Sequence, residues 1–434
     1  MTARLQNRFE RIKHRIGGSL RELGPGLVTG AADDDPSGIA TYSQAGAQFG
    51  YSLLWTMVLT YPLMSAIQLV SAHIGRVTGA GLASNLVRTF PKRAVALLVG
   101  ILAIANTINI GADLSAMAAS ARLVAGGGEH VFVIVFATVS TLLQLYVPYR
   151  QYAHILKWLT LTLFAYVGVL LVVHTDWPAA AVGLVLPKEL GSDALLTIVA
   201  VFGTTISPYL FFWQSSQEAE EIADSPTQKS IRQSPRSAPQ QFRRMRFDTL
   251  TGMAFSNFIA LAIMMATAAT LHSRGITQIN SSAQAAEALR PVAGDFAFGL
   301  FAVGIIGTGF LAVPILAGST AFAVAEIFGW TEGLERQPKQ AAGFYSVIVF
   351  ATLIGLLIDW SPIDPMRALF WSAVLNGVTA VPLMIAMMIV VSRHEVMGRF
   401  TANRTLVLFG WAATAVMTLA SGAMLVDSVG HAIG

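Results

Sequence analysis

Three consecutive carboxylates, Asp33, Asp34 and Asp35, lie near the middle of an apolar stretch and are followed directly by Pro36. A charged side chain at bilayer depth costs about 2.5–3.5 kcal/mol or more, so it normally faces a cavity and marks a functional site. Carboxylate oxygens suit hard cations such as Mg²⁺, Ca²⁺ and Mn²⁺. These residues therefore indicate cation binding inside a membrane.

The stretch that carries these carboxylates is predicted to be an interrupted helix. Pro36 lacks an N–H group and disfavours helical geometry at Asp35, and Ser37 and Gly38 weaken the helix further. Unpaired backbone groups at this depth are tolerated only where they line protein or water. The alternative is an exposed loop between two short helices, because the upstream apolar run 23–32 is only about half a span.

A second polar break occurs in the sixth apolar stretch. Gly203, Thr204, Thr205, Ser207 and Pro208 interrupt the run there. A lone proline kink in a transmembrane helix is usually structural. Two polar breaks, in the first and sixth spans, are typical of inverted-repeat transporters that bind their substrate between two discontinuous helices.

The elements that would position these breaks are transmembrane helices. Of the 434 residues, 54% are hydrophobic and only 12% are charged, which excludes a soluble enzyme and a nucleic-acid binder. The absence of cysteine excludes disulfides, thiolate metal sites and cysteine nucleophiles. We predict eleven spans at about 25–48, 51–73, 94–121, 131–148, 155–174, 195–220, 247–271, 295–328, 342–359, 366–391 and 405–426.

The positions of basic residues predict the orientation. With the N-terminal segment 1–24 in the cytoplasm, inner segments hold 23 of the 28 Lys and Arg residues, as the positive-inside rule requires. The C-terminus then lies outside. We expect the protein in the plasma (inner) membrane of a prokaryote. The polar segment 224–246 is predicted to be a flexible cytoplasmic linker, with binding to anionic lipid headgroups as the alternative.

At the two breaks the sequence resembles the NRAMP divalent-metal transporter family. The family signature D-P-G-N corresponds to Asp35-Pro36-Ser37-Gly38, and A-T-V-M-P-H-N corresponds to the run 204–210; an upstream Gly-Pro-Gly also matches. The resemblance implies an all-α, LeuT-type fold. It has a first five-helix repeat at 25–174, an inverted second repeat at 195–391 with discontinuous helices 1 and 6, and an eleventh helix at 405–426.

Departures from the family pattern indicate which metal is carried. The family's Asn position is Gly38, and its Met position is Ser207. A thioether suits transition metals, so its loss leaves a roomier site with hard oxygen donors. Mg²⁺ keeps several of its waters, and such a site fits a largely hydrated ion. The sequence thus resembles the NRAMP-related magnesium transporter branch, although Mn²⁺ accepts the same ligands.

The resemblance implies a set of metal-site residues. Asp35 is the principal ligand, Ser207 offers a hydroxyl and Gly38 leaves space. The remaining candidates are the carbonyls of Ala32 and Thr204 and the side chains of Asp34 and Asn376. Two of these have an equally weighted alternative: Asp34 would point into a vestibule, and Asn376 would form a helix kink with an interhelical hydrogen bond.

The residues that carry protons in coupled family members are largely replaced. The two histidine positions read Tyr209 and Gln214, and a helix-three carboxylate pair keeps Asp113 but has Ala116 as its partner. Neither replacement titrates near neutral pH. Asn106, Asn109 and Asp113 share one helix face, where interhelical hydrogen bonding is favoured over a water path.

These observations predict a carrier of divalent cations, preferentially Mg²⁺ and also Mn²⁺, that works by alternating access without proton coupling. The metal is the substrate, no cofactor is expected, and the bilayer is the other partner. The alternatives are a proton-coupled Mn²⁺/Fe²⁺ importer, an amino-acid carrier on the same scaffold, and an intramembrane aspartyl protease. The run Glu218, Glu220 and Glu221 is interpreted as a solvated helix end, with a cation exit vestibule as the alternative.

Overall fold

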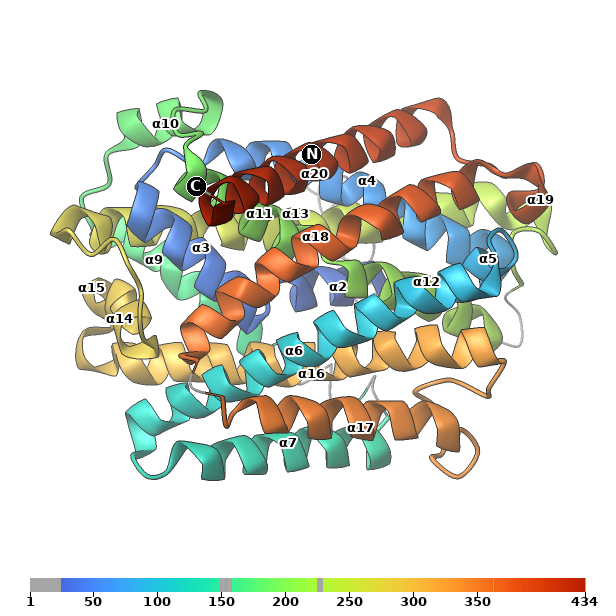
Figure 1. Ribbon diagram of the computed structural model, residues 1–434, viewed down its shortest axis with the longest axis horizontal. Helices are drawn as coiled ribbons and strands as arrows, with labels where there is room; N and C mark the ends of the chain where they lie inside the picture. Colours follow the sequence, from blue (N-terminus) through green and yellow to red (C-terminus); the bar gives the residue numbers. More distant parts are fainter. Residues whose placement is uncertain are drawn as a thin grey trace, which may run out of the picture.

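The computed structural model describes residues 25–148, 151, 156, 158–224, 229–361 and 363–433, and the predicted cytoplasmic segment 1–24 lies outside them. In this part of the chain all regular structure is helical (Figure 1). The long elements are α2 (Pro25–Asp33), α3 (Pro36–Phe49), α4 (Trp55–Thr78), α6 (Lys92–Ala125), α7 (Glu129–Tyr146), η1 (Leu159–Leu163) continuing into α9 (Phe164–Val172), α11 (Ser192–Thr205), α12 (Pro208–Asp224), α13 (Ala238–Thr270), α16 (Ala297–Phe328), α17 (Ala342–Ile358), α18 (Pro365–Ser392) and α20 (Arg404–Ile433). The short connecting helices are α5 (Leu82–Val87), α10 (Trp177–Val185), η2 (Pro235–Ser237), η3 (His272–Arg274), α14 (Ser282–Ala286), η4 (Glu287–Leu289), α15 (Arg290–Ala293), η5 (Gly294–Phe296) and α19 (His394–Met397).

The helices are long and apolar enough to make this a multi-pass membrane protein. Eight helical segments of the described chain have the length and hydropathy to cross a bilayer. Two shorter apolar helices, Leu159–Val172 and Ala342–Ile358, together with the interrupted pair α2 and α3, occupy the remaining three predicted spans. The exact number of crossings stays a prediction.

The two interrupted helices lie inside the bundle, where glycines allow close packing. α2 packs against α13, and α11 packs against α18. A Cβ atom on Gly30 would overlap the backbone of Gly252, and one on Gly203 would overlap the backbone at Ala373 and Gly377. Small residues at such contacts let helix backbones approach each other closely. Both broken helices are thereby held against long, continuous neighbours.

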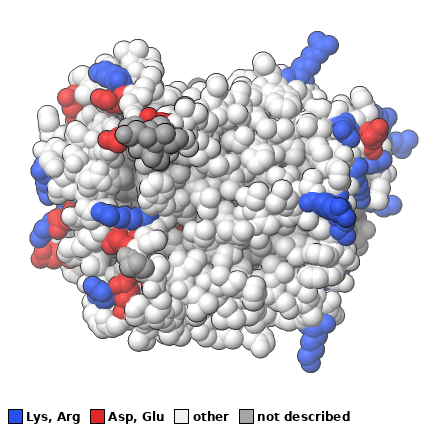
Figure 2. Space-filling view, in the orientation of Figure 1, with Lys and Arg blue, Asp and Glu red and all other residues white. Residues whose placement is uncertain are grey.

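Charged side chains gather at the two ends of the bundle, with an uncharged band between them (Figure 2). Lys and Arg predominate at the end that carries α5 and α19, on the right, whereas both signs mix at the end that carries α10 and α14. This distribution agrees with the positive-inside expectation. We therefore call the α5/α19 end the basic end, and its cytoplasmic location stays a prediction.

The segment between α12 and α13 differs from its prediction. α13 begins at Ala238, directly after η2, rather than near 247. Upstream of it, Ile231 is fully buried, and its N–H donates to the carbonyl of Arg76 at 3.2 Å. The flexible linker predicted for 224–246 is therefore wrong for the described residues 229–246, because an apolar anchor and a helix start hold them against the bundle.

Candidate metal-binding site

The two helix breaks face each other, as the sequence predicts. α2 ends at Asp33 and α3 begins at Pro36, while α11 ends at Thr205 and α12 begins at Pro208. In each case the helix restarts at a proline, whose missing N–H removes one backbone hydrogen bond. Across the gap, the hydroxyls of Ser37 and Thr204 are 3.5 Å apart. The first and sixth predicted spans therefore share one polar centre.

Asp35 is the carboxylate at this centre that accepts the most hydrogen bonds. It caps α3: its Oδ1 accepts from the Gly38 N–H at 2.7 Å and from the Ser37 hydroxyl at 2.8 Å. Its Oδ2 accepts from the Asn109 amide at 3.3 Å and the Tyr209 hydroxyl at 3.4 Å. Four donors around a side chain that is 1% exposed suit a charged carboxylate, which accepts hydrogen bonds and donates none.

Backbone oxygens of the breaks are also held in place by side chains. The Tyr209 hydroxyl donates to the carbonyl of Ala32 at 3.3 Å, so one side chain bridges both candidate ligands of the first break. The Ser207 hydroxyl donates to the carbonyls of Gly203 at 2.8 Å and Thr204 at 2.7 Å. Ser207 is thus turned toward its own helix, and the Thr204 carbonyl keeps one lone pair for another partner.

Two side chains pack closely around Gly38. A Cβ atom there would lie 3.2 Å from the Thr204 hydroxyl and 3.2 Å from the ring of Tyr42. In this conformation a larger residue at position 38 would press against the side chains of Thr204 and Tyr42, and room for a hydrated ion at Gly38 stays a prediction.

Asp33 and Asp34 point to the other side of the break, toward α13. The Ser256 hydroxyl lies 2.5 Å from Asp33 Oδ2 and 3.2 Å from Asp34 Oδ1. The second oxygen of each carboxylate has no hydrogen-bond partner among the described residues. Asp34 is 1% exposed and does not open into a vestibule, so the vestibule alternative for it is wrong.

Two more buried polar side chains lie on the helices around the breaks. Asn376 is fully buried, and neither its Oδ1 nor its Nδ2 finds a partner within the described chain. One turn earlier on α18, Ser372 donates to Asn109 Oδ1 at 2.6 Å, which links this helix to the ligand shell of Asp35. Asp113 is also fully buried, and both of its oxygens lack a partner in the described part of the chain.

The polar stripe on α6 divides between two roles. Asn106 donates to the Leu316 carbonyl, Ser319 and Thr320 of α16, at 2.9–3.2 Å, which is the predicted interhelical hydrogen bonding. Asn109 instead donates to Asp35 and belongs to the site.

Ion pairs link three helices at the basic end of the bundle, and the pair between Arg76 and Glu218 is buried. Arg76 of α4 donates to Glu218 of α12 at 2.6 Å and also pairs with Glu221. Arg244 of α13 pairs with Glu221 at 2.9 Å. Glu218 is 1% exposed, so its interpretation as a solvated helix end is wrong: an arginine from another helix compensates its charge.

A hydrogen-bonded chain connects these ion pairs with the first helix. Gln214 donates to Glu218 at 3.1 Å and accepts from the Thr29 hydroxyl of α2 at 2.7 Å. Gln68 of α4 reaches the Leu210 carbonyl at 3.1 Å. The three helices α2, α4 and α12 are thus tied together on the basic side of Asp35.

At the basic end, in the loop after α16 and outside the spans, the carboxyl group of Glu332 has a strongly raised pKa. Burial, followed by the nearby carboxylates of Glu326 and Glu220, raises the pKa of Glu332 to about 9. Glu220 accepts from the backbone N–H of Leu334 at 2.7 Å, which holds the loop after α16 against α12.

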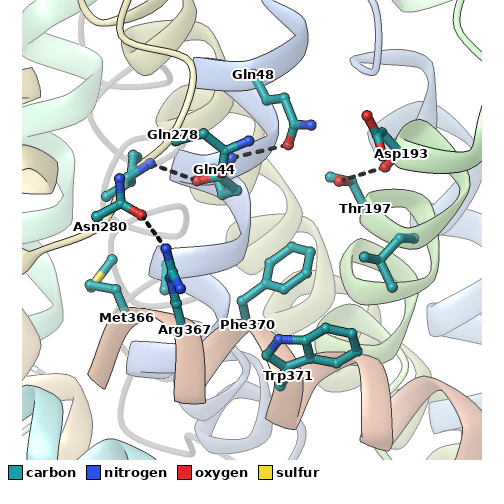
Figure 3. Close-up of a pocket in the computed structure, with 13 residues that line it drawn as sticks. Gln44, Gln48, Asp193, Thr197, Gln278, Asn280, Met366, Arg367, Phe370 and Trp371 are labelled. Atoms are coloured by element: carbon teal, nitrogen blue, oxygen red, sulfur yellow. Dashed lines mark hydrogen bonds between the residues drawn. The ribbon is translucent and has the colours of Figure 1, made fainter. Parts of the chain in front are cut away.

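A cavity of about 310 Å³ lies at the N-terminal ends of α11 and α18, which are the ends of these helices away from the basic end (Figure 3). Its polar lining comes from Gln44 and Gln48 of α3, Asp193 of α11, Asn280 of the loop before α14, and Arg367 of α18. The guanidinium of Arg367 donates to the side-chain oxygen of Asn280 at 3.0 Å. The cavity also reaches Ala40, five positions after Asp35 on α3 and therefore about 7.5 Å along its axis. The polar cavity thus lies at the end of the bundle opposite the ion pairs of the basic end.

Sequence reasoning missed four residues of this arrangement: Asn109 and Tyr209 as donors to Asp35, Ser256 beside Asp33, and Arg76 at the basic end. Asn109 had a usable signal in its helical phase with Asp113, and Tyr209 had one in its place directly after Pro208 within the matched run 204–210. The others act on residues far away in the chain.

Comparisons with known proteins show which family the chain resembles along nearly its whole length. The family model for natural resistance-associated macrophage protein-like (Nramp) proteins matches residues 26–427. The divalent metal cation transporter MntH of Klebsiella pneumoniae (strain 342) is 26% identical over 99% of this chain and 98% of its own length. MntH of Burkholderia ambifaria is 28% identical over 93% of this chain and 88% of its own.

Solved structures show the same fold. A manganese transporter from Eremococcus coleocola, in complex with an aromatic bis-isothiourea substituted compound, superposes with a TM-score of 0.73 at 17% identity. The match covers 93% of this chain and 85% of that one. Mhp1, a nucleobase-cation-symport-1 family transporter, matches with a TM-score of 0.55 at 13% identity, over 93% of this chain and 92% of its own.

Proposed function

The chain belongs to the Nramp family of membrane transporters, which are not enzymes, and we propose that it carries hard divalent cations, Mg²⁺ in preference to Mn²⁺. The metal is the transported substrate and not a cofactor. Transport proceeds by alternating access around the paired breaks, and it does not require a stoichiometric flow of protons.

The observation that carries this proposal is the donor set at the breaks. One hydrogen-bonded cluster offers a metal ion only oxygen ligands. They are the carboxylate of Asp35, the hydroxyls of Ser37 and Thr204, and the carbonyl of Ala32. Ser207 stands where the family pattern has a thioether. Oxygen ligands suit Mg²⁺ and Mn²⁺, whereas a thioether favours softer transition metals. The absence of the thioether therefore lowers affinity for competing soft ions more than affinity for Mg²⁺.

The same surroundings fit a cation that retains water. Mg²⁺ dehydrates reluctantly and is usually bound through one or two carboxylates with several waters in place. Gln44, Gln48 and Asn280 line the cavity that begins about one and a half helical turns beyond Asp35, at Ala40, and their amides both donate to and accept from water. A hydrated ion exchanges hydrogen bonds along this surface without shedding its shell. Because Gly38 is tightly surrounded, the site must widen when the ion enters.

The residues at the two positions where the family pattern has histidine support transport without proton coupling. The hydroxyl of Tyr209 hydrogen-bonds to Asp35 and to the carbonyl of Ala32. The amide of Gln214 hydrogen-bonds to Thr29 and Glu218. The membrane potential alone suffices as a driving force, since it contributes about 2.3 kcal/mol per charge per 100 mV. A divalent ion therefore gains about 4.6 kcal/mol at −100 mV.

The amino-acid carrier is the less favourable alternative. Such carriers use free N–H groups at the restart of the broken helix to hold a substrate carboxylate. Here the Gly38 N–H is already bonded to Asp35, and two more carboxylates lie next to it. A substrate carboxylate would meet repulsion where it needs donors.

Uptake into proteoliposomes tests the proposal. With an inside-negative potential, we expect Mg²⁺ and Mn²⁺ to enter faster than Ca²⁺, and an enclosed pH dye to show no acidification in proportion to metal uptake. Proton entry in a fixed ratio to Mg²⁺ would refute uncoupled transport. Uptake of Mn²⁺ that excess Mg²⁺ fails to inhibit would refute the magnesium preference and favour the proton-coupled Mn²⁺/Fe²⁺ importer.

A further inference from the structure

A groove of about 750 Å³ lies at the surface of the bundle where α6, α16 and α17 pack against one another (Figure 1). Its lining is almost entirely apolar and includes Ile104 of α6, Val324 of α16 and Phe350 of α17. Ile104 and Phe350 are 62% and 66% exposed, although both lie within apolar helices. Exposed apolar side chains on a membrane-spanning helix face lipid, so the groove opens toward the hydrocarbon of the bilayer.

The few hydroxyl groups in this groove are committed to their own helices. Thr107, Thr320 and Ser346 line it, and each donates to the carbonyl four positions earlier at 2.7–3.0 Å. An occupant therefore meets an apolar surface with no hydroxyl proton left to bind it. A hydrocarbon chain fits such a surface, because filling the groove gains dispersion contacts that an empty groove would forfeit.

The length of the groove matches a lipid chain. Its lining on α17 runs from Gly343 to Ile358, which is about 22 Å along the helix axis. The hydrocarbon core of a bilayer is about 30 Å thick, so one leaflet accounts for about 15 Å. An acyl chain that enters from the basic end therefore finds a lining through the whole depth of its leaflet.

Aromatic and basic side chains mark the basic end of the groove. Trp330 lines the groove and stacks on Phe328, with the ring centroids 5.1 Å apart. The Nζ atom of Lys92, at the start of α6, lies 5.5 Å from the centroid of the Phe328 ring. Lys92 is exposed and forms no ion pair within the described part of the chain. Trp at the membrane interface marks the headgroup level, and a Lys there attracts anionic headgroups.

The charge near Trp330 complements a phosphate. Lys and Arg predominate at this end of the bundle (Figure 2). The acidic residue nearest to Trp330 in the sequence is Glu332, and burial followed by nearby carboxylates raises its pKa to about 9. Glu332 is therefore protonated at neutral pH and does not repel an anion next to Lys92.

We propose that this groove binds one anionic phospholipid, with an acyl chain between α6 and α17 and the phosphate at Lys92. Basic sites between transmembrane helices are suited to anionic lipid headgroups. The bound lipid contacts α6, α16 and α17 together, so it stabilises their packing in the purified protein. The site is separate from the helix breaks and does not depend on which metal is carried.

Thermal unfolding of the full-length chain in a neutral detergent tests the headgroup contact. Titration with phosphatidylglycerol should raise the melting temperature to a plateau, because a ligand that binds the folded state stabilises it. In Lys92→Gln we expect the half-maximal concentration of phosphatidylglycerol to rise about fivefold, which corresponds to the about 1 kcal/mol that one basic residue contributes. Zwitterionic phosphatidylcholine should respond less to this change. The matched control is Arg399→Gln, since Arg399 also lies over a ring at the basic end, 5.0 Å from the centroid of Phe400, but away from the groove.

Filling the groove tests the position of the acyl chain. Ser346→Phe and Thr107→Phe each place a ring in the groove, from α17 and from α6, and neither breaks a hydrogen bond between helices. Both should abolish the saturable stabilisation by phosphatidylglycerol while melting like wild type without lipid, and either variant decides the question if the other folds poorly. Leu419→Phe on α20, at a position that is 73% exposed, controls for an added ring on the lipid-facing surface.

Four outcomes would overturn the proposal. Equal losses in Lys92→Gln and Arg399→Gln would show that diffuse surface charge attracts the lipid, and unchanged stabilisation in the groove variants would place the lipid elsewhere. Stabilisation by soluble glycerol 3-phosphate equal to that by phosphatidylglycerol would assign the site to a free phosphate. A dimer in native mass spectra that Ser346→Phe abolishes would assign the groove to a second copy of the chain. None of these results involves metal uptake, so each leaves the proposed function standing.

Discussion

The Tyr209 hydroxyl and the Asp35 carboxylate lie 3.4 Å apart although 174 positions separate them in the chain. The same hydroxyl reaches the carbonyl of Ala32 at 3.3 Å, so the restart of the second broken helix is joined to both ends of the first break. When α12 moves relative to α2, these contacts must either break or move together with both helices. The ligand geometry at Asp35 is therefore coupled to the helix motion that transport requires.

Removing the charge of Asp35 should abolish most transport. Asp35→Asn retains the shape of the side chain but loses charge-assisted contacts, which are worth up to about 3 kcal/mol. We expect initial Mg²⁺ uptake into proteoliposomes to fall about 100-fold, which corresponds to about 2.7 kcal/mol. Asp295→Asn is the matched control, and wild-type uptake by Asp35→Asn would contradict the site.

Removing the Tyr209 hydroxyl should slow transport moderately. A hydrogen bond contributes about 0.5–1.5 kcal/mol, so Tyr209→Phe should reduce uptake about 2–10-fold. Proton entry, followed with an enclosed pH dye, should stay uncoupled in both proteins. Tyr146→Phe, at a position that is 76% exposed, controls for loss of a phenol. If Tyr209→Phe alters proton entry per metal ion, the hydroxyl has a role in proton transfer instead.

Restoring a thioether should shift metal preference. Ser207→Met removes the hydroxyl that bonds the Thr204 carbonyl at 2.7 Å and places a soft ligand beside the break. We expect the ratio of Mn²⁺ to Mg²⁺ uptake, measured in competition, to rise about tenfold, or about 1.4 kcal/mol of differential binding. Ser207→Ala removes the hydroxyl without adding sulfur and should not produce this shift; an equal shift in both variants would rule out the thioether as its cause.

The breaks were predictable from the sequence because their signals are local. Pro36 and Pro208 remove N–H groups within apolar runs, and the restart of each helix follows directly. The close packing at Gly38 was not predictable, since it depends on Tyr42 and Thr204 lying around it. The resemblance identified Asp35 but gave no reason to expect that Asp33 and Asp34 point to a different helix.

Contacts between distant segments were the least predictable part. Arg76 lies in the last turn of α4, and its pairing with Glu218 spans 142 positions. The sequence shows a basic residue near one helix end and three glutamates near another, and hydropathy cannot tell which of them meet. The same limitation made 229–246 look flexible, because the burial of Ile231 depends on tertiary packing.

Raising the pH should destabilise the loop that carries Glu332. Its pKa is raised from an ordinary value of 4.5 to about 9, so the folded protein holds a proton that the unfolded chain releases. Stability contributed by this protonated form is lost as the pH rises from about 4.5 to 9. Thermal unfolding should show Glu332→Gln melting above wild type at pH 9, with the difference shrinking toward pH 5. A constant difference across this range would show that Glu332 does not titrate as expected.

Breaking the buried pair at the basic end should open that end. Arg76 is 5% exposed at its side chain and Glu218 is 1% exposed, and removing one partner of a buried pair costs about 3–5 kcal/mol. Arg76→Gln should therefore favour conformations in which α12 and α2 separate from α4. The chain has no native cysteine, so Thr29→Cys provides a single labelling position beside Gln214. In proteoliposomes, a membrane-impermeant thiol reagent should label it several-fold faster in the Arg76→Gln background than with Arg76 intact.

The contrast with Arg244 decides whether burial of the ion pair is responsible. Arg244 pairs with Glu221 but is 38% exposed, and exposed pairs contribute only about 0–1 kcal/mol. Arg244→Gln should therefore change the labelling rate little, and Arg76→Gln combined with Glu218→Gln should lie between wild type and the single Arg76 variant, because no unpaired charge remains at Glu218. Equal labelling in the Arg76→Gln and Arg244→Gln backgrounds would mean that general surface charge, and not the Arg76–Glu218 contact, keeps the basic end closed.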